Sequence, residues 1–450
     1  MPLGLLPMAE ILKRDGHDVE IAHAGNEEQF DAGFSVEKYV EDEGAELVCL
    51  PLHWHQQTYE VREALKRIKA RTPKVKTVLG GLTASWFAAD IINEWPEADY
   101  VIRGEGEKPL KELAEALAEG KKDLSGVPNL VWRKRGRTTE NKEIYVAGPG
   151  DLAELVFTDR SLIRNHEKYT AHYYSNPEKE KTGESFHHPL HYLYIGRGCT
   201  ADCAFCGGGV GAHKLIANRD GAIFRDPDAV YEDIKTTYEK YGITDFYACF
   251  NPPGTDNGYF TRLFDRIGRS GMDVSMVFEY YNGVPDEAFI EAFASAFNKS
   301  ESRIAFSPTS FSDEWRPCFY PPGITDTELE TAVKNISKHG IQTLLYYALL
   351  PSETEGDIHD GLSHAMDLRK RHASTMRIFP IEMEPASPWS LAPKKYGISL
   401  KRKTLADYLE HHARGTDGFA KSDLGYSFPG FGSSKQVFDL LARFTTQLYE

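Results

Sequence analysis

The sequence predicts an α/β protein with two regions in which apolar strands alternate with amphipathic helices. Such alternation is typical of parallel sheets whose two faces are covered by helices. The 450-residue chain is long enough for two or three domains. We therefore expect a doubly wound, Rossmann-like parallel sheet in residues 1–120 and a second βα domain in 186–389. A connector, 121–185, lies between them, and a small, mostly helical cap follows in 390–450.

The pattern of apolar residues places the individual elements. In the first region the predicted strands are 18–24, 45–52, 75–79 and 100–102, and the predicted helices are 5–15, 36–43, 59–71, 84–94 and 108–118. The connector contains a predicted hairpin, 129–146. In the second region the predicted strands are 192–195, 245–250, 273–280, 302–306, 342–349 and 376–382, and the helices between them include 229–241, 259–270, 286–297 and 326–339.

The composition restricts the kinds of partner. With 67 acidic and 52 basic residues the net charge is −15, which argues against non-specific binding to nucleic acid or to anionic membranes. No apolar run approaches the roughly 18 residues of a membrane span, and the N-terminus lacks a signal-peptide pattern. Six cysteines in a chain of this length indicate reduced thiols and a cytoplasmic enzyme.

Three of the six cysteines lie within eight residues at the spacing C-x3-C-x2-C: Cys199, Cys203 and Cys206. Thiolates at this spacing can hold three irons of a [4Fe–4S] cluster and leave the fourth iron open to a small molecule. The alternative is a zinc site with His213 or a distant residue as the fourth ligand. Zinc knuckles usually have paired C-x2-C elements, and the sequence contains no second pair. We therefore favour the cluster.

At this motif the chain resembles the radical SAM superfamily. The resemblance implies that the cysteines hold a [4Fe–4S] cluster whose open iron binds S-adenosylmethionine (SAM). It also implies that Phe205 packs near the adenine and that Gly207 and Gly208 belong to the cofactor-binding loop. The βα units of the second region suit the partial (β/α)6 barrel of this superfamily, with an active site at the carboxyl ends of the strands. The implied partners are a small-molecule substrate and a reducing electron donor such as flavodoxin or ferredoxin.

Three loops after predicted strands of the first region carry unusual residues: His53 and Trp54, then Gly80 and Gly81, then Arg103, Gly104 and Glu105. Ligands of such sheets bind beyond the carboxyl ends of the strands. No G-x-G-x-x-G follows the first strand, so we do not expect a dinucleotide. In combination the loops resemble the cobalamin-binding domain that precedes the radical SAM domain in one large subfamily, and the resemblance covers most of the chain. It implies that these residues bind cobalamin.

Two features depart from that subfamily's pattern. The signature Asp-x-His-x-x-Gly, whose histidine binds cobalt, is absent, as is common in this subfamily. The chain also begins where the first helix should begin, so the first strand of the usual domain is missing. The alternative is a domain that keeps the fold without binding cobalamin. For the lower face of the corrin we expect Trp54 or a neighbouring histidine, His53 or His55, and the alternative is ordinary loop packing.

A carboxylate ends the third predicted strand of the second region. We predict Glu279 and the adjacent Tyr280 as catalytic residues, because this strand end should face the cysteine loop. A carboxylate after an apolar strand needs a partner. Glu279 therefore contacts SAM or substrate, or reaches the open iron, or else it forms an ion pair with Arg303 or Arg316. The resemblance places polar SAM contacts after the fourth strand, which implies that Ser310 binds the cofactor.

The resemblance implies a cobalamin-dependent radical SAM enzyme. The favoured activity is a methyltransferase that alkylates an unactivated carbon of a small-molecule or natural-product substrate. One SAM would methylate cobalamin, and a second would give the 5′-deoxyadenosyl radical that prepares the substrate carbon for the methyl group of methylcobalamin. Two alternatives stay open. One is rearrangement, ring contraction or cyclisation without net methyl transfer, and the other is a non-catalytic protein that binds SAM and a cluster.

Overall fold

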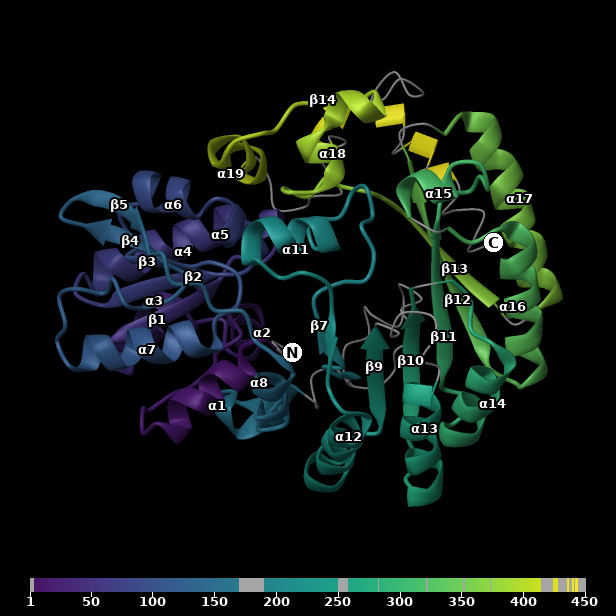
Figure 1. Ribbon diagram of the computed structural model, residues 1–450, viewed down its shortest axis with the longest axis horizontal. Coiled ribbons are helices and arrows are strands. Elements are labelled where there is room, and N and C mark those ends of the chain that lie inside the picture. Colours follow the sequence, from purple (N-terminus) through teal and green to yellow (C-terminus); the bar gives the residue numbers. More distant parts are fainter. Residues whose placement is uncertain are drawn as a thin grey trace.

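The computed structural model describes two α/β bodies that lie side by side, with a small cap along one end of both (Figure 1). The described residues are 4–169, 190–249, 258–281, 283–320, 323–350, 353–372, 374–413, 424–427, 435–436, 439–440 and 442–443. Part of the predicted connector, 170–185, therefore lies outside the described residues, as does most of the cap beyond 413. The predicted α/β fold class is confirmed. No described helix is both long and apolar enough to cross a membrane.

The first body contains a five-stranded sheet in the order β1-β2-β3-β4-β5. Strands β1 (Leu47–Pro51), β2 (Lys76–Gly80) and β3 (Tyr100–Ile102) are parallel. The predicted hairpin is present as β4 (Leu130–Lys134) and β5 (Arg137–Glu140), and β4 pairs antiparallel to β3. The hairpin from the predicted connector thus extends the first sheet.

Helices cover both faces of this sheet. They are α1 (Leu6–Arg14), α2 (Ala24–Phe30), α3 (Val36–Asp42), α4 (Thr58–Arg71), α5 (Leu82–Trp86), α6 (Ala88–Glu94) and α7 (Glu107–Ala118). Alternate side chains of a strand point to opposite faces. Leu79 and Val101 accordingly pack in the core that contains residues of α4 and α6, whereas Val78 and Ile102 pack with residues of α1 and α7.

The predicted strand at 18–24 is wrong. Ile21 forms an isolated parallel bridge with Ile163. Its backbone N–H donates to Leu162 O over 2.7 Å, and its carbonyl accepts from Arg164 N–H over 2.9 Å. Because its partner is one short turn of the connector, this segment adds no strand to the described sheet.

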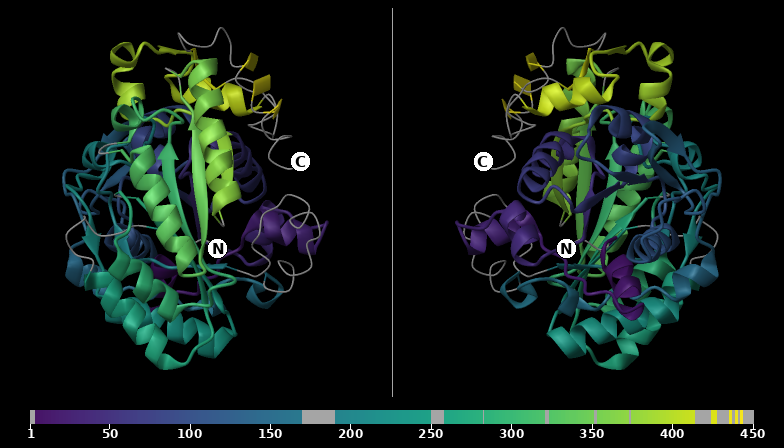
Figure 2. Two further views of the ribbon diagram at one scale, coloured as in Figure 1. Left: turned by 90° about the vertical axis from the view of Figure 1, so that its right-hand side faces the viewer. Right: turned by 90° about the vertical axis from the view of Figure 1, so that its left-hand side faces the viewer.

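The second body contains six parallel strands that follow one another in chain order from one edge of the sheet to the other. They are β6 (Leu190–Tyr192), β9 (Asp245–Cys249), β10 (Ser275–Tyr280), β11 (Arg303–Thr309), β12 (Gln342–Leu349) and β13 (Ser374–Pro380). Helices cover the outer side of this sheet (Figures 1 and 2), and they include α12 (Pro227–Tyr241), α13 (Gly258–Ser270), α14 (Glu287–Ala296), α16 (Asp326–Lys338) and α17 (Glu355–Arg371). The predicted six strands of the open barrel are confirmed.

Aromatic packing fixes the central strand of this sheet to its helices. Phe278 of β10 packs edge-to-face against Phe260 of α13, with ring centres 4.8 Å apart, and against Phe289 of α14 at 5.3 Å. Each such pair contributes about 0.5–1.5 kcal/mol beyond the burial of its surface. The carboxyl end of β10, where the predicted catalytic residues lie, is therefore rigidly held.

The cap contacts both bodies. Its described elements are α18 (Pro388–Leu391), η3 (Pro393–Tyr396), β14 (Ser399–Leu400), α19 (Leu405–Ala413) and β15 (Tyr426–Ser427). Leu405 and Tyr408 of α19 are buried in the core of the first body, whereas Trp389 of α18 packs against Phe319 of the second. The cap stays at one end of the molecule in all views (Figure 2). Short elements of the second body are β7 (Gly196–Arg197), α11 (Val210–Ala217), β8 (Ile223–Phe224) and α15 (Arg316–Phe319).

Candidate cofactor site

The three cysteines lie in the loop between β7 and α11, which we call the cysteine loop (residues 198–209). Its backbone N–H groups donate to two of the sulfurs, from Ala201 to Cys199 Sγ over 3.4 Å and from Gly208 to Cys206 Sγ over 3.3 Å. Hydrogen bonds of this kind stabilise thiolate sulfur and tune the potential of a bound iron–sulfur cluster.

Two distant segments hold the cysteine loop in place. The Ala204 N–H donates to Phe319 O over 3.0 Å, and the Ala204 carbonyl accepts from Trp389 N–H over 2.8 Å. Phe205 packs edge-to-face against Trp389, with 6.1 Å between ring centres. Phe205, which the resemblance places near adenine, is therefore the residue of the cysteine loop whose ring packs against the start of the cap.

The sulfur atoms fit a multi-iron cluster better than a single ion. Burial raises the pKa of all three thiols, to about 11 for Cys206, and a bound metal favours the thiolates instead. One zinc ion would hold its sulfur ligands about 3.8 Å apart, given Zn–S bonds of ~2.3 Å. The described groups whose ligand atoms all lie within 4.8 Å of one another do not include the three cysteines. Their wider spacing disfavours the zinc alternative.

The glycines after Cys206 differ in what surrounds them. A Cβ on Gly207 would overlap the carbonyl oxygen of Pro385 and lie 2.9 Å from Glu384 Cβ. A Cβ on Gly208 would make only ordinary contacts, the nearest at 3.5 Å to Leu82 Cδ1. Because Leu82 begins α5 of the first body, the cysteine loop lies directly beside the loop that follows β2.

The glycine pair at the end of β2 brings two predicted cofactor loops together. Gly80 is in register with Pro51 at the end of β1. Gly81 has a φ of 111°, a conformation that residues with a side chain rarely adopt. A Cβ there would lie 2.7 Å from His53 Cα. Gly80, Gly81 and His53 thus meet at the carboxyl edge of the first sheet, where such sheets bind ligands.

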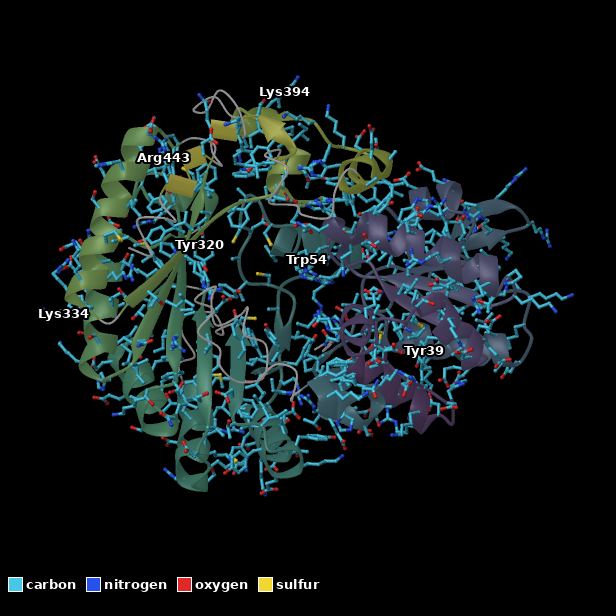
Figure 3. All side chains as sticks on the ribbon, turned by 180° about the vertical axis from the view of Figure 1, so that it is seen from behind. Tyr39, Trp54, Tyr320, Lys334, Lys394 and Arg443 are labelled. Carbon is cyan, nitrogen blue, oxygen red and sulfur yellow. The ribbon has the colours of Figure 1, made fainter. Side chains whose placement is uncertain are left out.

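Trp54 is a large apolar residue exposed at this edge, beside the exposed His53. It is 42% exposed and lies between the two bodies (Figure 3). Gln57 Oε1 accepts hydrogen bonds from the backbone N–H groups of His53 and Trp54 over 2.9 and 3.0 Å. Burial, and then the nearby His213, lower the pKa of His53 to about 4, so its imidazole is neutral near pH 7 and can bind a metal. An exposed indole beside a neutral imidazole fits the flat face of a corrin.

The loop after β3 lies at the contact between the bodies. Gly104 has a φ of 69°, and a Cβ there would lie 2.8 Å from Ala217 Cβ of α11. Arg103 forms an ion pair with Glu140 of β5 at the surface. These contacts place Gly104 against α11 of the second body and Arg103 beside β5 of the first.

Glu105 joins the two bodies through buried ion pairs. Its carboxylate accepts from Arg219 Nη2 over 3.0 Å, from Arg197 Nη1 over 3.3 Å and from the Ala147 N–H over 2.6 Å. Arg197 Nη1 also donates to Glu107 Oε2 over 2.9 Å. Burial opposes the charge, but the hydrogen bond from Arg219 and the charge of Arg197 lower the pKa of Glu105. The position of Glu105 is therefore a structural one, in the contact between the two bodies.

Tyrosines surround Glu279 at the end of β10. The Tyr281 hydroxyl donates to Glu279 Oε2 over 2.5 Å. Burial, and then the Glu279 charge, raise the pKa of Tyr247 on β9 and of Tyr346 on β12. Burial raises the pKa of Tyr320, and the thiols of the cysteine loop and Glu279 raise it further. Glu279 and the cysteine loop therefore face the same space.

The alternative ion pairs of Glu279 are not formed among the described residues. Arg316 instead pairs with Asp326, over 2.7 Å, and with Asp313. Arg303 Nη1 donates to the carbonyl of Glu301 over 3.2 Å.

The structure does not bring Tyr280 to Glu279. Tyr280 is buried, and its ring packs against Phe289 with centres 5.3 Å apart, on the opposite face of β10, since side chains alternate along a strand. Sequence reasoning placed Tyr281 beside Glu279 at the strand end and missed Tyr247. The period of two along β9 could have found Tyr247, because Cys249 is in register with Glu279.

Ser310 is fully buried and its hydroxyl donates to Glu353 Oε1 over 2.5 Å. The same carboxyl accepts from the Phe311 N–H over 2.7 Å and from the Leu350 N–H over 2.9 Å. Burial raises the pKa of Glu353 to about 7. In this structure the Ser310 hydroxyl therefore supports the loop after β11.

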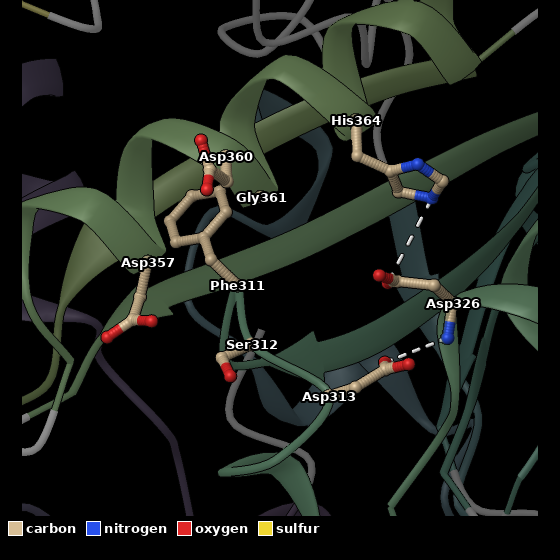
Figure 4. Close-up of a pocket in the computed structure, with 8 residues that line it drawn as sticks. All are labelled: Phe311, Ser312, Asp313, Asp326, Asp357, Asp360, Gly361 and His364. Carbon is tan, nitrogen blue, oxygen red and sulfur yellow. Dashed lines mark hydrogen bonds and ion pairs between the residues drawn. The ribbon is translucent and has the colours of Figure 1, made fainter.

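A described pocket lies outside the barrel, between that loop and the N-terminal turns of α16 and α17 (Figure 4). Asp326 N–H donates to Asp313 Oδ1 over 2.8 Å, and His364 Nε2 lies 3.9 Å from Asp326 Oδ1. Its lining contains none of the predicted site residues, so it is separate from the cofactor site.

Comparison with known families assigns both bodies. Residues 1–114 match the B12 binding domain, and residues 193–364 match the Radical SAM superfamily. These ranges contain the cofactor loops of the first body and the cysteine loop.

Two curated relatives are methyltransferases by name. The hopanoid C-3 methylase of Methylococcus capsulatus is 29% identical over 206 residues, which are 46% of this chain and 35% of that protein. The cytidylyl-2-hydroxyethylphosphonate methyltransferase of Streptomyces wedmorensis is 26% identical over 299 residues, with 60% of this chain and 54% of that protein covered. The chain thus spans about a third to a half of the length of these relatives.

Solved structures share the complete fold. TsrM, a radical SAM methyltransferase from Kitasatospora setae with cobalamin and a [4Fe–4S] cluster bound, has a TM-score of 0.68 at 16% identity, covering 98% of this chain and 86% of TsrM. The cobalamin-dependent SAM radical enzyme OxsB has a TM-score of 0.63 at 14% identity, covering 99% and 64%. The two matched domains and the shared fold together identify the parts of the chain. The chain joins a B12 binding domain to a Radical SAM superfamily domain, and the cofactors of these domains are cobalamin, a [4Fe–4S] cluster and SAM.

Proposed function

We propose that this protein is a methyltransferase that alkylates an unactivated carbon of a small-molecule substrate. The observation that carries the proposal is the contact between the two cofactor loops, where Leu82 of the first body lies against Gly208 of the cysteine loop. When bound, the cluster and SAM supply hydrogen-atom abstraction and cobalamin supplies methyl transfer. Both must act on one carbon, so the loops that hold them have to be neighbours.

Different residues of the chain hold the cluster, hold cobalamin and orient the ligand. Cys199, Cys203 and Cys206 hold the cluster, and the loops with His53, Trp54, Gly80 and Gly81 hold cobalamin. Glu279, with a hydrogen bond from Tyr281, orients a donor group of SAM or of the substrate, or accepts its proton. The tyrosines around Glu279 line the space that the substrate shares with the cysteine loop.

Labelled SAM tests the proposal. The protein is reconstituted anaerobically with iron, sulfide and cobalamin, reduced by flavodoxin, and incubated with a small-molecule extract of its host and SAM that carries a trideuterated methyl group. Mass spectrometry should find a product that has gained one labelled methyl group, together with 5′-deoxyadenosine. The Cys199, Cys203 and Cys206 triple alanine variant should form neither, whereas Cys318→Ala, at an exposed cysteine outside the loop, should form both.

The other outcomes separate the alternatives. A product with unlabelled carbon, formed together with 5′-deoxyadenosine, would indicate rearrangement or cyclisation. The latter is the activity named for a 23% identical relative, the anaerobic magnesium-protoporphyrin IX monomethyl ester cyclase of Synechocystis. SAM binding without any cleavage would indicate a non-catalytic protein.

A further inference from the structure

A second cluster of metal-ligating side chains lies where three parts of the chain meet. His55 comes from the loop after β1, Glu382 from the segment after β13, and His412 from α19 of the cap. One nitrogen of each imidazole and one oxygen of Glu382 lie within 4.8 Å of one another. None of these side chains has a role in the proposed function, so the inference stands independently of it.

His55 is the centre of this cluster and is 0% exposed. Its Nδ1 lies 3.0 Å from His412 Nε2. Its Nε2 lies 3.4 Å from Glu382 Oε2 and 3.6 Å from Glu384 Oε1, and it has no hydrogen-bond partner in the structure. A buried ring nitrogen without a partner costs free energy. The geometry therefore favours a further group between the imidazole and the carboxylates.

The charges around His55 favour a cation. Two carboxylates, Glu382 and Glu384, face the same imidazole. Gln56 Nε2 donates to Glu382 Oε2 over 3.1 Å, and Arg402 lies near enough to act on both His55 and Glu384. Two carboxylates in one partly buried place repel each other. A divalent ion between them would lower their mutual repulsion.

We propose that His55, His412 and Glu382 bind a zinc ion and that Glu384 supplies the fourth ligand. Imidazole nitrogen and carboxylate oxygen bind zinc at about 2.0–2.2 Å, and a site with four protein ligands is typical of structural zinc. A zinc ion binds one ring nitrogen of His55, and the unpartnered Nε2 faces both carboxylates. One nitrogen of His412 lies within 4.8 Å of a ring nitrogen of His55 and of an oxygen of Glu382. The ion fastens the cap to both bodies at one point.

The same contacts without a metal would be a hydrogen-bonded chain from His412 through His55 to Glu382. Metal content separates the two arrangements. Zinc and iron are measured in the full-length protein purified anaerobically and dialysed against a weak chelator. We expect about one zinc per chain in addition to the cluster iron. The zinc should remain in the Cys199, Cys203 and Cys206 triple alanine variant, in which the iron is lost.

Substitutions of the proposed ligands test where the zinc ion binds. His412→Ala and Glu382→Gln should each reduce retained zinc roughly tenfold or more. His412 lies on the cap helix, so its variant tests the site even if His55→Ala does not fold. The matched control is His339→Ala, since His339 contacts Glu287 over 2.8 Å in an exposed acidic group at the surface, and this variant should keep the zinc. A strong chelator should lower the melting temperature of the parent protein and leave that of His412→Ala unchanged.

Zinc retained in His412→Ala and Glu382→Gln, or lost equally in His339→Ala, would overturn the proposal, as would the absence of zinc after growth in zinc-supplemented medium. The last result would identify the cluster as the metal-free hydrogen-bonded chain.

Discussion

Among its described contacts, the Glu279 carboxylate has tyrosine hydroxyl groups around it and no arginine. An ion pair would occupy its lone pairs and fix its charge. The hydroxyls of Tyr281 and Tyr247 both hydrogen-bond to Glu279, and a carboxylate has about four acceptor positions, so some remain for a ligand. Glu279 can therefore accept a hydrogen bond from a hydroxyl or amino group of a ligand.

Glu279→Gln keeps the size of the side chain and removes its charge. We expect a folded variant that retains its iron and loses 5′-deoxyadenosine production by roughly 10²–10⁴-fold, the usual contribution of a positioned acid or base. Glu301→Gln, at an exposed carboxylate, is the control. Both variants should melt close to the parent protein because neither breaks a described ion pair. Unchanged turnover in Glu279→Gln would remove Glu279 from the site.

Glu353 gives the stability of the protein a defined pH dependence. Burial raises its pKa from 4.5 to about 7, so the folded protein holds the proton more tightly than the unfolded chain. The contribution of this group is most favourable below about pH 4.5, and stability is lost as the pH rises through about 7. The full change is on the order of 3 kcal/mol.

Glu353→Gln removes this titration. The melting temperature of the parent relative to the variant should therefore fall between pH 5 and pH 8, measured at constant ionic strength. A difference that stays constant over this range would show that the carboxyl does not change its protonation there.

The cysteine loop is the element whose shape the sequence specifies most tightly. Gly207 meets Pro385 O and Glu384 Cβ, whereas Gly208 has room for a methyl group. Gly207→Ala must therefore displace the loop or the segment after β13, and we expect it to lower iron content severalfold, because overpacking typically costs about 1–3 kcal/mol. Gly208→Ala should keep the parent's iron content. Equal iron in the two variants would contradict the close approach.

Elements were predictable where a local pattern determines them. The apolar run at 342–349 is β12 with the predicted bounds, and the spacing of the cysteines indicated the cluster. The strand at 18–24 was wrong because a strand needs a neighbour, and Ile21 meets only the turn at Ile163. Tyr247 was missed for a similar reason, since its closeness to Glu279 depends on the register between β9 and β10.

At the scale of the whole molecule, Glu105 couples the B12-binding and radical SAM domains. It lies among Arg219, Arg197 and Ala147, and it is 7% exposed. Glu105→Ala leaves the buried Arg219 without its carboxylate, which we expect to destabilise the protein by about 3–5 kcal/mol. Arg103→Ala breaks the more exposed pair with Glu140 and should cost at most about 1 kcal/mol. Equal effects in chemical denaturation would show that the Glu105 contact does not join the domains.

The arrangement of the domains was the part that the sequence did not reveal. The contact between Leu82 and Gly208, and the meeting of His55 with His412, join segments far apart in the chain. No local periodicity encodes such pairs. The resemblance predicted both cofactor loops, but the space that they share, and the use of Glu105 between the domains, depend on the folded structure.

The most direct test of the account is the number of iron and cobalt atoms per chain in anaerobically purified protein made with cobalamin supplied. We expect about four irons and about one cobalt per chain. The Cys199, Cys203 and Cys206 triple alanine variant should lose the iron and keep the cobalt, and Trp54→Ala should lose cobalt and keep the iron. Iron replaced by zinc that disappears with the three cysteines, or a parent protein that retains no corrinoid, would contradict the assignment of two cofactors to one shared site.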